Sequence, residues 1–410
     1  MTRPYQIGFY DSSLGPGGTT RYLLELLDGL DRNTFHPIFF ALERRPWHDA
    51  LVARGVELVL LHPDESRGTG LQACVPENTG LKAGATKPKL RLPRSVAWFL
   101  GTVGETRTLM RLFKKRPVDL LHSNDVGAEP APLAARLAGV PRIVAFFHVD
   151  STYDFGKRSS WRYRKLERWS IGSLDYAIAP TENTKQDWIA RTGLRRYESK
   201  TAIIHLGVSA DRLQRRRSIA EAKAALGIPA DAIVIASMGR LEGHKGYEYL
   251  IRALPAILQH QPTALAVIAG KGPLEGELRD LAKQLGVSHA LRLLGFVNEI
   301  RDVLEAADVY IQPSLCETTG FALLEAGCLC VPLLGSAVGG IPEVIIDGVT
   351  GLLFPPRDPE QIAAKVTRLL QEPALGERLG RAAQERVKQE FSPADMVAAT
   401  SALYLRMLGA

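Results

Sequence analysis

Short apolar runs alternate with amphipathic stretches along the whole chain, and this alternation predicts parallel β-sheets whose strands are joined by helices. In the first half, the apolar runs predict seven strands, at residues 6–10, 37–41, 57–61, 119–123, 142–147, 176–179 and 202–205. In the second half they predict five more, at residues 233–238, 264–269, 291–294, 309–312 and 331–334. Helices are expected to begin near Gly246, Pro273, Glu299, Phe321 and Pro359. We therefore predict an α/β protein with two doubly wound domains.

A polar, arginine-rich stretch at residues 211–218, DRLQRRRS, follows the last strand of the first half and marks the expected domain boundary. We assign residues 1–207 to the first domain and residues 208–392 to the second. Residues 393–410 are predicted to form one more amphipathic helix, which we expect to pack back on the first domain. Residues 62–93 lack periodicity and form a connection longer than most loops in compact domains, which indicates a functional or a disordered loop.

The composition narrows the class of protein. With 410 residues, of which 46% are hydrophobic, the chain can bury two cores, and this excludes a single small binding module. The four cysteines match neither a disulfide framework nor a CxxC site, so we expect reduced thiols in a cytoplasmic protein. The sequence has no apolar stretch of about 18 residues and no basic-then-apolar leader, which predicts a protein that neither spans a membrane nor is secreted.

The segment PSLCETTGFALLEAG, residues 313–327, places two glutamates eight positions apart, Glu317 before an expected helix and Glu325 within it. A helix that begins near Thr319 or Gly320 would point its free N–H groups and its positive dipole end at the carboxyl edge of the sheet, where an anion such as phosphate can bind. Taken alone, two such glutamates are more often a helix cap and a solvated side chain.

A second segment places two cations at the same kind of edge. The strand DAIVIASM runs into GRLEGHKG, so that Arg240 and Lys245 follow the carboxyl end of the strand. Ligands of open α/β sheets bind there. A guanidinium and an ammonium can neutralise a diphosphate without a divalent metal, although an ordinary charged surface loop fits this segment equally well.

The first domain offers a glycine-rich loop and two histidines. Gly17 and Gly18 stand between the first strand and a helix, where a ligand could approach the backbone closely. His148 ends a strand, and an imidazole at this edge can donate a hydrogen bond to a sugar hydroxyl. His122 ends another strand, and we expect it to be structural.

Several common motifs are absent from the sequence. The glycine loop does not match GxGxxG, so the fingerprint of a dinucleotide-binding domain is missing. The chain has no DxD tripeptide, which argues against a metal–diphosphate site. It also has no GxSxG, GxxxxGK[ST] or HExxH motif.

Taken in order, the GG loop, the strand-end histidine, GRL(x)3KG, E(x)7E and GSAVGGIPEVIIDGVTGLLF resemble the retaining nucleotide-sugar glycosyltransferases of family 4. The resemblance covers nearly the whole chain and is strongest over residues 237–356. It implies the GT-B fold, in which two Rossmann-like domains face a central cleft and the donor lies mostly on the second domain.

The resemblance also implies roles for single residues. The implied donor-binding residues are Gly17, Gly18, Arg240, Lys245, Glu317, Gly320, Phe321 and Glu325. Arg240 and Lys245 would hold the diphosphate together with the amides at the helix start. Glu325 would bind the ribose hydroxyls and Glu317 the transferred sugar. His148 would lie beside the reactive carbon, so the implied catalytic set is His148, Glu317, Arg240 and Lys245.

One position departs from the family pattern, because Thr319 stands where an aromatic residue is usual, so the sugar pocket is expected to differ in shape.

The implied reaction moves a sugar, with retention of configuration, from a UDP- or GDP-sugar to a hydroxyl acceptor in glycan, glycolipid or polysaccharide biosynthesis. No cofactor or metal is expected, since the cations and the helix start can stabilise the leaving diphosphate. We expect departure and attack on one face of the sugar, because no residue is placed as a covalent nucleophile. Two alternatives remain open: a noncatalytic GT-B protein that binds a nucleotide sugar, and a nucleotide-sugar epimerase of the same fold.

Charge suggests a further partner. The formal net charge of the chain is +7, and residues 82–116 alone carry ten basic side chains and one acid. Within them, residues 95–116 are predicted to form a basic amphipathic helix, which suits an anionic membrane face or a lipid-linked acceptor. A solvated helix whose apolar side packs on the first sheet is the alternative. Nucleic acid is not expected, since no recognition module accompanies the charge.

Overall fold

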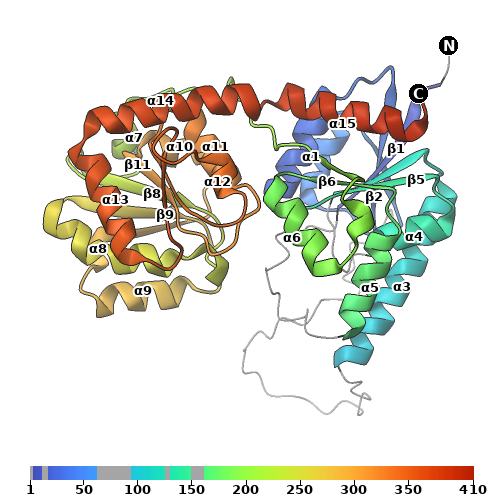
Figure 1. The fold of residues 1–410 in the computed structure, drawn as a ribbon, viewed down its shortest axis with the longest axis horizontal. Helices are drawn as coiled ribbons and strands as arrows, with labels where there is room; N and C mark the ends of the chain where they lie inside the picture. The colour runs from blue at the N-terminus through green and yellow to red at the C-terminus, as the bar shows by residue number, and fades with distance from the viewer. Residues whose placement is uncertain (1–2, 12–16, 62–93, 125–129, 149–160) are drawn as a thin grey trace.

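The computed structural model describes residues 3–11, 17–61, 94–124, 130–148 and 161–410; of residues 94–100 and 161–164 it describes the helical backbone alone. The chain folds into two α/β domains, each built on one parallel sheet (Figure 1). This confirms the predicted fold class. The predicted loop at 62–93 and the basic residues before 94 lie outside the described residues.

The N-terminal domain contains a seven-stranded parallel sheet with the order β3-β2-β1-β4-β5-β6-β7. Its strands are β1 (Tyr5–Tyr10), β2 (Phe35–Ala41), β3 (Glu57–Leu60), β4 (Leu120–Ser123), β5 (Arg142–Phe146), β6 (Tyr176–Ala179) and β7 (Thr201–Ile203). Its α-helices are α1 (Gly18–Gly29), α2 (Asp49–Val52), α3 (Arg94–Lys115), α4 (Ala131–Ala138), α5 (Trp161–Gly172) and α6 (Glu182–Thr192). The strands next to β1 are β2 and β4, so the strand order reverses direction beside β1, where ligands of such sheets bind.

The C-terminal domain repeats this plan with six parallel strands in the order β10-β9-β8-β11-β12-β13. The strands are β8 (Ile233–Met238), β9 (Ala264–Ala269), β10 (Leu291–Gly295), β11 (Val309–Gln312), β12 (Leu333–Ser336) and β13 (Leu352–Phe354). The helices around them are α7 (Ile219–Ala225), α8 (Tyr247–His260), α9 (Glu275–Gln284), α10 (Ile300–Glu305), α11 (Phe321–Cys328), α12 (Ile341–Val344) and α13 (Pro359–Gln371). The reversal of strand order falls between β8 and β11.

Apolar strands explain the layered core. The central strand β8, IVIASM, is almost completely buried, because helices cover both faces of a parallel sheet and leave no strand face in water. Val234 and Ala236 pack in one buried cluster while Ile235 packs in another, as alternation along a strand requires.

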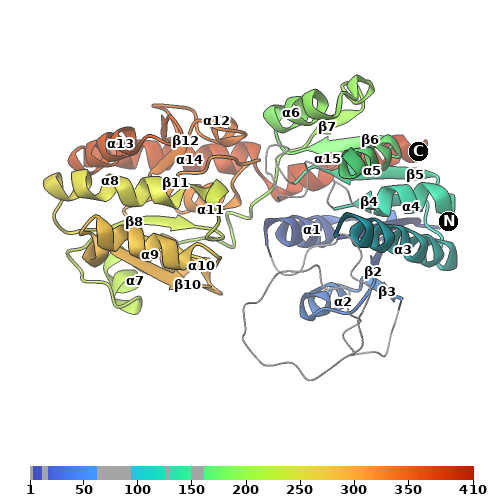
Figure 2. The same cartoon turned by 90° about the horizontal axis from the view of Figure 1, so that it is seen from below.

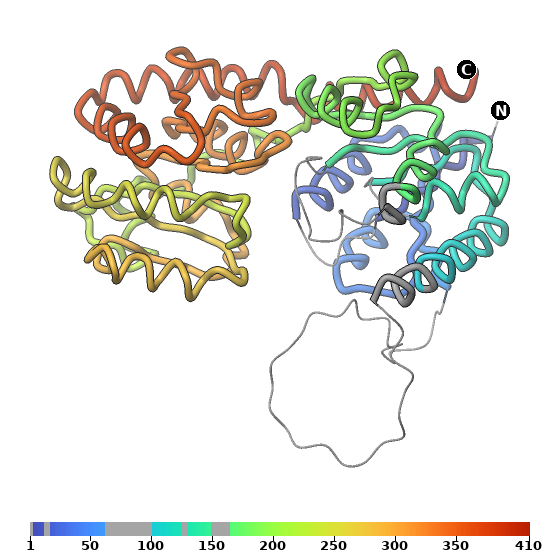
Figure 3. Tube along the Cα trace, turned by 60° about the horizontal axis from the view of Figure 1, so that its bottom comes forward, coloured from blue at the N-terminus to red at the C-terminus, as the bar shows by residue number. Residues whose placement is uncertain are grey.

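The chain ends in two long helices that connect the domains. Helix α14 (Pro373–Glu390) runs along the C-terminal domain, and α15 (Pro393–Leu408) continues from it onto the N-terminal domain (Figure 3). There α15 packs against α1, where Val397 lies beside Gly29. The Tyr404 hydroxyl lies 2.6 Å from Nδ1 of His122, which is completely buried. Residues 393–410 thus lie on the first domain, and His122 supports this contact.

Most predicted elements are present, with shifts at the ends. The strand predicted at 331–334 begins two residues later, at Leu333, because Pro332 has no N–H for the sheet. The edge strand β13 was not predicted, since its three residues are too few to show a period.

Candidate active site

Two loops at the carboxyl ends of β8 and β11 contact each other and form the base of the site. The Leu315 amide donates to the His244 carbonyl at 2.7 Å. Gly246, with a φ of +64°, packs so tightly that a Cβ there would lie 2.0 Å from the Pro313 carbonyl oxygen. Only glycine allows this approach. The contact brings the loop that carries Lys245 against the loop that carries Glu317.

Lys245 and Glu317 form an ion pair where these two loops meet. Lys245 Nζ donates to Glu317 Oε2 at 2.6 Å, and the two side chains are 17% and 12% exposed. The same oxygen accepts from Gln312 Nε2 at 3.2 Å and from Ser314 Oγ at 3.3 Å. Among the described residues, no donor reaches Oε1 of Glu317. The carboxylate is therefore fixed through one oxygen, and the other remains an acceptor.

Buried polar groups behind Glu317 hold it in position. The Tyr310 hydroxyl donates to Gln312 Oε1 at 2.7 Å, and Gln312 Nε2 also donates to Ser314 Oγ at 2.8 Å. Burial raises the pKa of Tyr310 well above its usual value, so the hydroxyl stays a donor. Sequence reasoning missed Gln312, although a glutamine that ends an apolar strand was an available signal.

Arg240 lies at the same sheet edge but does not share the partner of Lys245. Its side chain is 64% exposed and pairs with Glu242, with Nη1 and Oε1 3.0 Å apart. The stem of Lys245 lies against Gly239, the residue before Arg240, since Cε would be 3.4 Å from a Cβ there. Arg240 and Lys245 therefore both lie near the carboxyl end of β8, and Arg240 is the more exposed of the two.

The start of α11 lies beside the glycine loop of the other domain. Gly320 precedes the helix with a φ of +83°, and no side chain caps it. Phe321 reaches across to Gly18, where a Cβ would lie 3.1 Å from its ring. A Cβ at Gly17 would meet nothing within 4 Å among the described residues. Among the described residues, no side chain accepts from the first N–H groups of α11, and none fills the space beside Gly17.

Glu325, the second glutamate of the pair, has a partner that sequence reasoning missed. Its Oε1 accepts from Arg21 of α1, so the ion pair joins the two domains. Glu325 is 7% exposed and Arg21 is 42% exposed. Burial raises the pKa of Glu325 to about 7, and the Arg21 guanidinium partly opposes this rise. No signal marks Arg21 in the sequence beyond its place after the glycine loop.

His148 lies at the domain contact close to Glu317. Its carbonyl accepts from Thr318 Oγ1 at 3.1 Å. The imidazole stacks on Phe146 with a centroid distance of 4.1 Å, and its Nε2 lies 3.1 Å from Oδ1 of Asn124. Burial, and secondly the neighbouring His122, lower the pKa of His148 well below 6.5, so the ring is neutral at neutral pH.

Other contacts fix how the domains meet around the site. The Glu343 carboxylate accepts from the amides of Glu182 and Asn183, at 2.9 and 2.7 Å, and so caps α6 from the opposite domain. Thr181 Oγ1 donates to the Thr318 carbonyl at 3.2 Å. Thr319, the position that departs from the family pattern, is completely buried.

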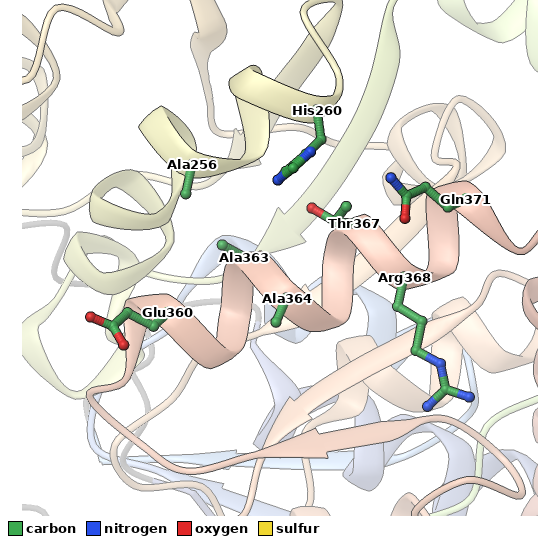
Figure 4. A pocket seen from close by; sticks show the side chains of 8 residues that line it. All are labelled: Ala256, His260, Glu360, Ala363, Ala364, Thr367, Arg368 and Gln371. Carbon is green, nitrogen blue, oxygen red and sulfur yellow. The ribbon is translucent and has the colours of Figure 1, made fainter.

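A separate cavity lies away from these residues. It has a volume of about 360 Å³ and sits between α8 and α13 (Figure 4). The side chains that line it are Ala256, His260, Glu360, Ala363, Ala364, Thr367, Arg368 and Gln371. None of them belongs to the predicted site.

The described residues contain neither a metal-binding cluster nor a membrane-spanning helix. They contain no group of three or more His, Cys, Asp and Glu side chains arranged to hold a metal ion. Among their helices, none combines the length and the apolar character needed to cross a bilayer. Cys316, Cys328 and Cys330 form no disulfide with one another, and Cys74 lies outside the described residues.

Comparison with known proteins identifies the family. The family model described as Glycosyltransferase Family 4 matches residues 16–212, and the model described as Glycosyl transferases group 1 matches residues 218–386. The glycogen synthase of Mycobacterium tuberculosis is 30% identical over 299 residues, which are 70% of this chain and 68% of that protein. This chain is a family 4 glycosyltransferase.

Other relatives of this glycosyltransferase carry different names. A D-inositol 3-phosphate glycosyltransferase of Streptomyces griseus is 31% identical over 323 residues, 71% of this chain and 67% of the relative. An uncharacterized glycosyltransferase of Methanocaldococcus jannaschii is 36% identical over 207 residues, 48% of this chain and 51% of the relative. The chain thus spans about half the length of some curated relatives and two thirds of others.

Solved structures confirm the GT-B fold of this glycosyltransferase. Anabaena HepE in complex with UDP-glucose superposes with a TM-score of 0.75, 18% identity and coverage of 98% of this chain and 100% of HepE. Sucrose-phosphate synthase of Thermosynechococcus elongatus gives a TM-score of 0.74 at 21% identity, with 99% of each chain covered.

Proposed function

We propose that this glycosyltransferase moves a sugar from a UDP- or GDP-sugar to a hydroxyl acceptor, with retention of configuration and without a metal ion. The observation that carries the proposal is the Lys245–Glu317 ion pair beside the uncapped start of α11. In this pair the Lys245 ammonium can bind a phosphate, and the adjacent Glu317 carboxylate can bind a hydroxyl of the sugar. The HepE complex with UDP-glucose supports UDP as the first nucleotide to test.

The cations of the site act on the leaving group. When the bond from the anomeric carbon to phosphate breaks, negative charge grows on the nucleoside diphosphate. The exposed Arg240 side chain can leave Glu242 and bind a phosphate of the donor. Lys245 can bind the same phosphate while it keeps its ion pair with Glu317. The N–H groups at the start of α11 complete the anion site. These groups stabilise the leaving diphosphate, and this is the part that a divalent metal plays in other transferases.

Glu317 orients the sugar in this scheme and does not attack it. Three donors already bind its Oε2, which lowers the nucleophilicity of the carboxylate. Its Oε1 accepts a hydroxyl of the sugar. The acceptor hydroxyl then attacks from the face that the diphosphate leaves, and a phosphate oxygen takes its proton. His148 lies beside the reacting carbon.

Glu325 binds the ribose hydroxyls in the proposed complex. Arg21 occupies only its Oε1, so Oε2 can accept a hydroxyl while the pair that joins the domains persists. We infer that the product belongs to glycan, glycolipid or polysaccharide biosynthesis, and the similarity to the glycogen synthase of Mycobacterium tuberculosis supports this.

We also propose that the enzyme is cytoplasmic and binds anionic membranes peripherally through the basic segment 82–116. In the described part of α3, Leu109, Leu112 and Phe113 are buried and face the sheet, which is the packing that the alternative interpretation expected. Helix α3 lies beside α4 (Figure 2). The exposed basic residues of its described part are Arg107, Arg111, Lys114 and Lys115. Attraction through these residues is electrostatic and disappears at high salt.

The decisive experiment measures turnover of Lys245→Ala and Glu317→Ala with a panel of UDP- and GDP-sugars, with and without EDTA. We expect each variant to lose at least about tenfold in turnover, because removing one charge-stabilising contact costs a few kcal/mol. Lys283→Ala is the matched control, since Lys283 is an exposed lysine of α9.

Each alternative has its own outcome. Unchanged turnover in both variants contradicts the assigned site. Stabilisation of the wild type by nucleotide sugars without any turnover favours a binding protein. Conversion of the sugar in the absence of an acceptor favours an epimerase.

A further inference from the structure

Asn124 follows β4, is completely buried and has each of its side-chain polar atoms bonded. Its Nδ2 donates to Asp11 Oδ2 at 2.8 Å and to the Thr19 carbonyl at 3.0 Å. Its backbone N–H donates to the Tyr10 carbonyl at 2.7 Å. Its Oδ1 lies 3.1 Å from Nε2 of His148. A short chain of hydrogen bonds therefore runs from the end of β1 through Asn124 to the predicted catalytic imidazole.

This chain fixes which way the amide of Asn124 points. A carbonyl only accepts hydrogen bonds, so the atom that faces the Thr19 carbonyl must be the donor nitrogen. The carboxylate of Asp11 makes the same demand on the second hydrogen of that nitrogen. Turning the amide over would set its oxygen against both acceptors and would break two hydrogen bonds in a buried place. Oδ1 must therefore face His148.

The orientation of the amide in turn fixes the proton of the imidazole. Because Oδ1 can only accept, Nε2 of His148 must carry the hydrogen. The described titratable groups near the ring are His122 from β4, Tyr22 from α1, 4.9 Å away between ring centroids, and Asp11 behind Asn124. None of them places a carboxylate against the ring, and the imidazole is neutral. Its Nδ1 then has a lone pair and no hydrogen.

We propose that Asn124 is a positioning residue that holds His148 in the Nε2–H tautomer, so that Nδ1 accepts a hydrogen bond from a hydroxyl of the bound sugar. From its position at a strand end alone, the imidazole of His148 is expected to donate to the sugar. The hydrogen bonds of Asn124 instead favour an imidazole whose Nδ1 accepts from the sugar. The proposal rests on the proposed function, since it supplies the sugar. Nothing in the sequence signals it, because Asn124 and Asp11 are 113 residues apart.

The first test reads the tautomer directly and needs no substrate. In protein labelled with ¹⁵N-histidine, nitrogen chemical shifts distinguish a protonated from an unprotonated ring nitrogen, and His148→Gln identifies the signals. We expect a protonated Nε2 and an unprotonated Nδ1 from pH 6 to 8, and we expect Asn124→Ala to give a mixture of tautomers. A protonated Nδ1 in the wild type overturns the proposal, whether or not a donor sugar has been found.

The second test asks whether Asn124 acts through His148. We expect Asn124→Ala to lower kcat about tenfold in the wild type and to have no effect in a His148→Ala background, because the ring that it positions is absent. The exposed Asn33→Ala is the matched control. An equal loss in both backgrounds shows a structural role only and overturns the proposal.

Discussion

Replacing Glu325 by glutamine is expected to make the protein more stable at alkaline pH while it weakens donor binding. The carboxyl of Glu325 is 7% exposed, and Arg21, its partner among the described residues, is itself 42% exposed. Burial dominates its electrostatics, and its pKa rises from the usual 4.5 to about 7. The glutamine side chain has nearly the same shape and carries no charge, so it avoids the cost of burying a carboxylate.

The size of the effect follows from this pKa. At about 1.4 kcal/mol per pKa unit, a rise from 4.5 to about 7 corresponds to about 3 kcal/mol. Below pH 4.5 the carboxyl is protonated in both the folded and the unfolded state, and no penalty exists. Near pH 7 the carboxyl is already ionised in the unfolded state. The folded state loses the proton only there, and burying the charge then costs free energy of folding. The wild type therefore loses up to about 3 kcal/mol of stability between these values, and Glu325→Gln does not.

Thermal unfolding of both proteins at pH 5 and pH 8 measures the difference. In a domain of this size, 1 kcal/mol shifts Tm by about 2–4 °C, so the gain of the variant at pH 8 should be several degrees larger than at pH 5. Titration with UDP should show weaker binding by the variant, because an amide replaces the carboxylate that we propose as the acceptor for the ribose hydroxyls. Glu377→Gln is the control, since Glu377 is 68% exposed and should show no such dependence on pH.

Two results would refute this reasoning. A gain of equal size at pH 5 and pH 8 would mean that ionisation of Glu325 has no part in it. A loss of stability at pH 8 would mean that the ion pair with Arg21 outweighs burial.

Two further predictions concern the loops around the site. Gly339→Ala should lower both the thermal stability and the affinity for UDP, since Gly339 has a φ of +53° and a Cβ there would lie 1.9 Å from the Glu317 carbonyl oxygen. Gly348 has a φ of +73°, and a Cβ there would have no described atom within 4 Å, so Gly348→Ala should cost only about 1 kcal/mol of strain and leave UDP affinity unchanged. Equal affinities in the two variants would contradict this. Glu343→Gln should remove about 1 kcal/mol from the capped start of α6 and speed hydrogen exchange of its first amides, and unchanged exchange would argue against the cap.

The sequence predicted those parts of the molecule that depend on local pattern. Strands such as β8 and β11 are short, apolar and buried on both faces, so their bounds were predicted to the residue. The helix near Phe321 was predicted because its segment follows an apolar strand in the alternating pattern of strands and helices. Lys245 and Glu317 could be singled out because both follow the carboxyl end of a strand, although their direct contact depends on the order of the strands in the sheet.

The remaining residues of the site depend on contacts between distant parts of the chain. Arg21 and Glu325 are 304 positions apart and meet only because the two domains close on each other. Gln312 and Asn124 are ordinary polar residues whose importance comes from what they orient. Local pattern carries no information about either kind of contact, so tertiary structure was needed to find them.

The return of α15 to the first domain has a mechanical consequence. The chain crosses between the domains twice, near residue 207 and again near residue 392, and the crossings touch: the Val208 amide donates to the Phe391 carbonyl at 2.9 Å. A Cβ at Gly207 would lie 2.5 Å from the backbone of Pro393. Two adjacent covalent connections restrict the relative motion of the domains mainly to one rotation, about an axis through residues 207–208 and 391–393. Any opening of the two domains should therefore be a rotation about this axis, and the parts of the domains farthest from the axis should move the most.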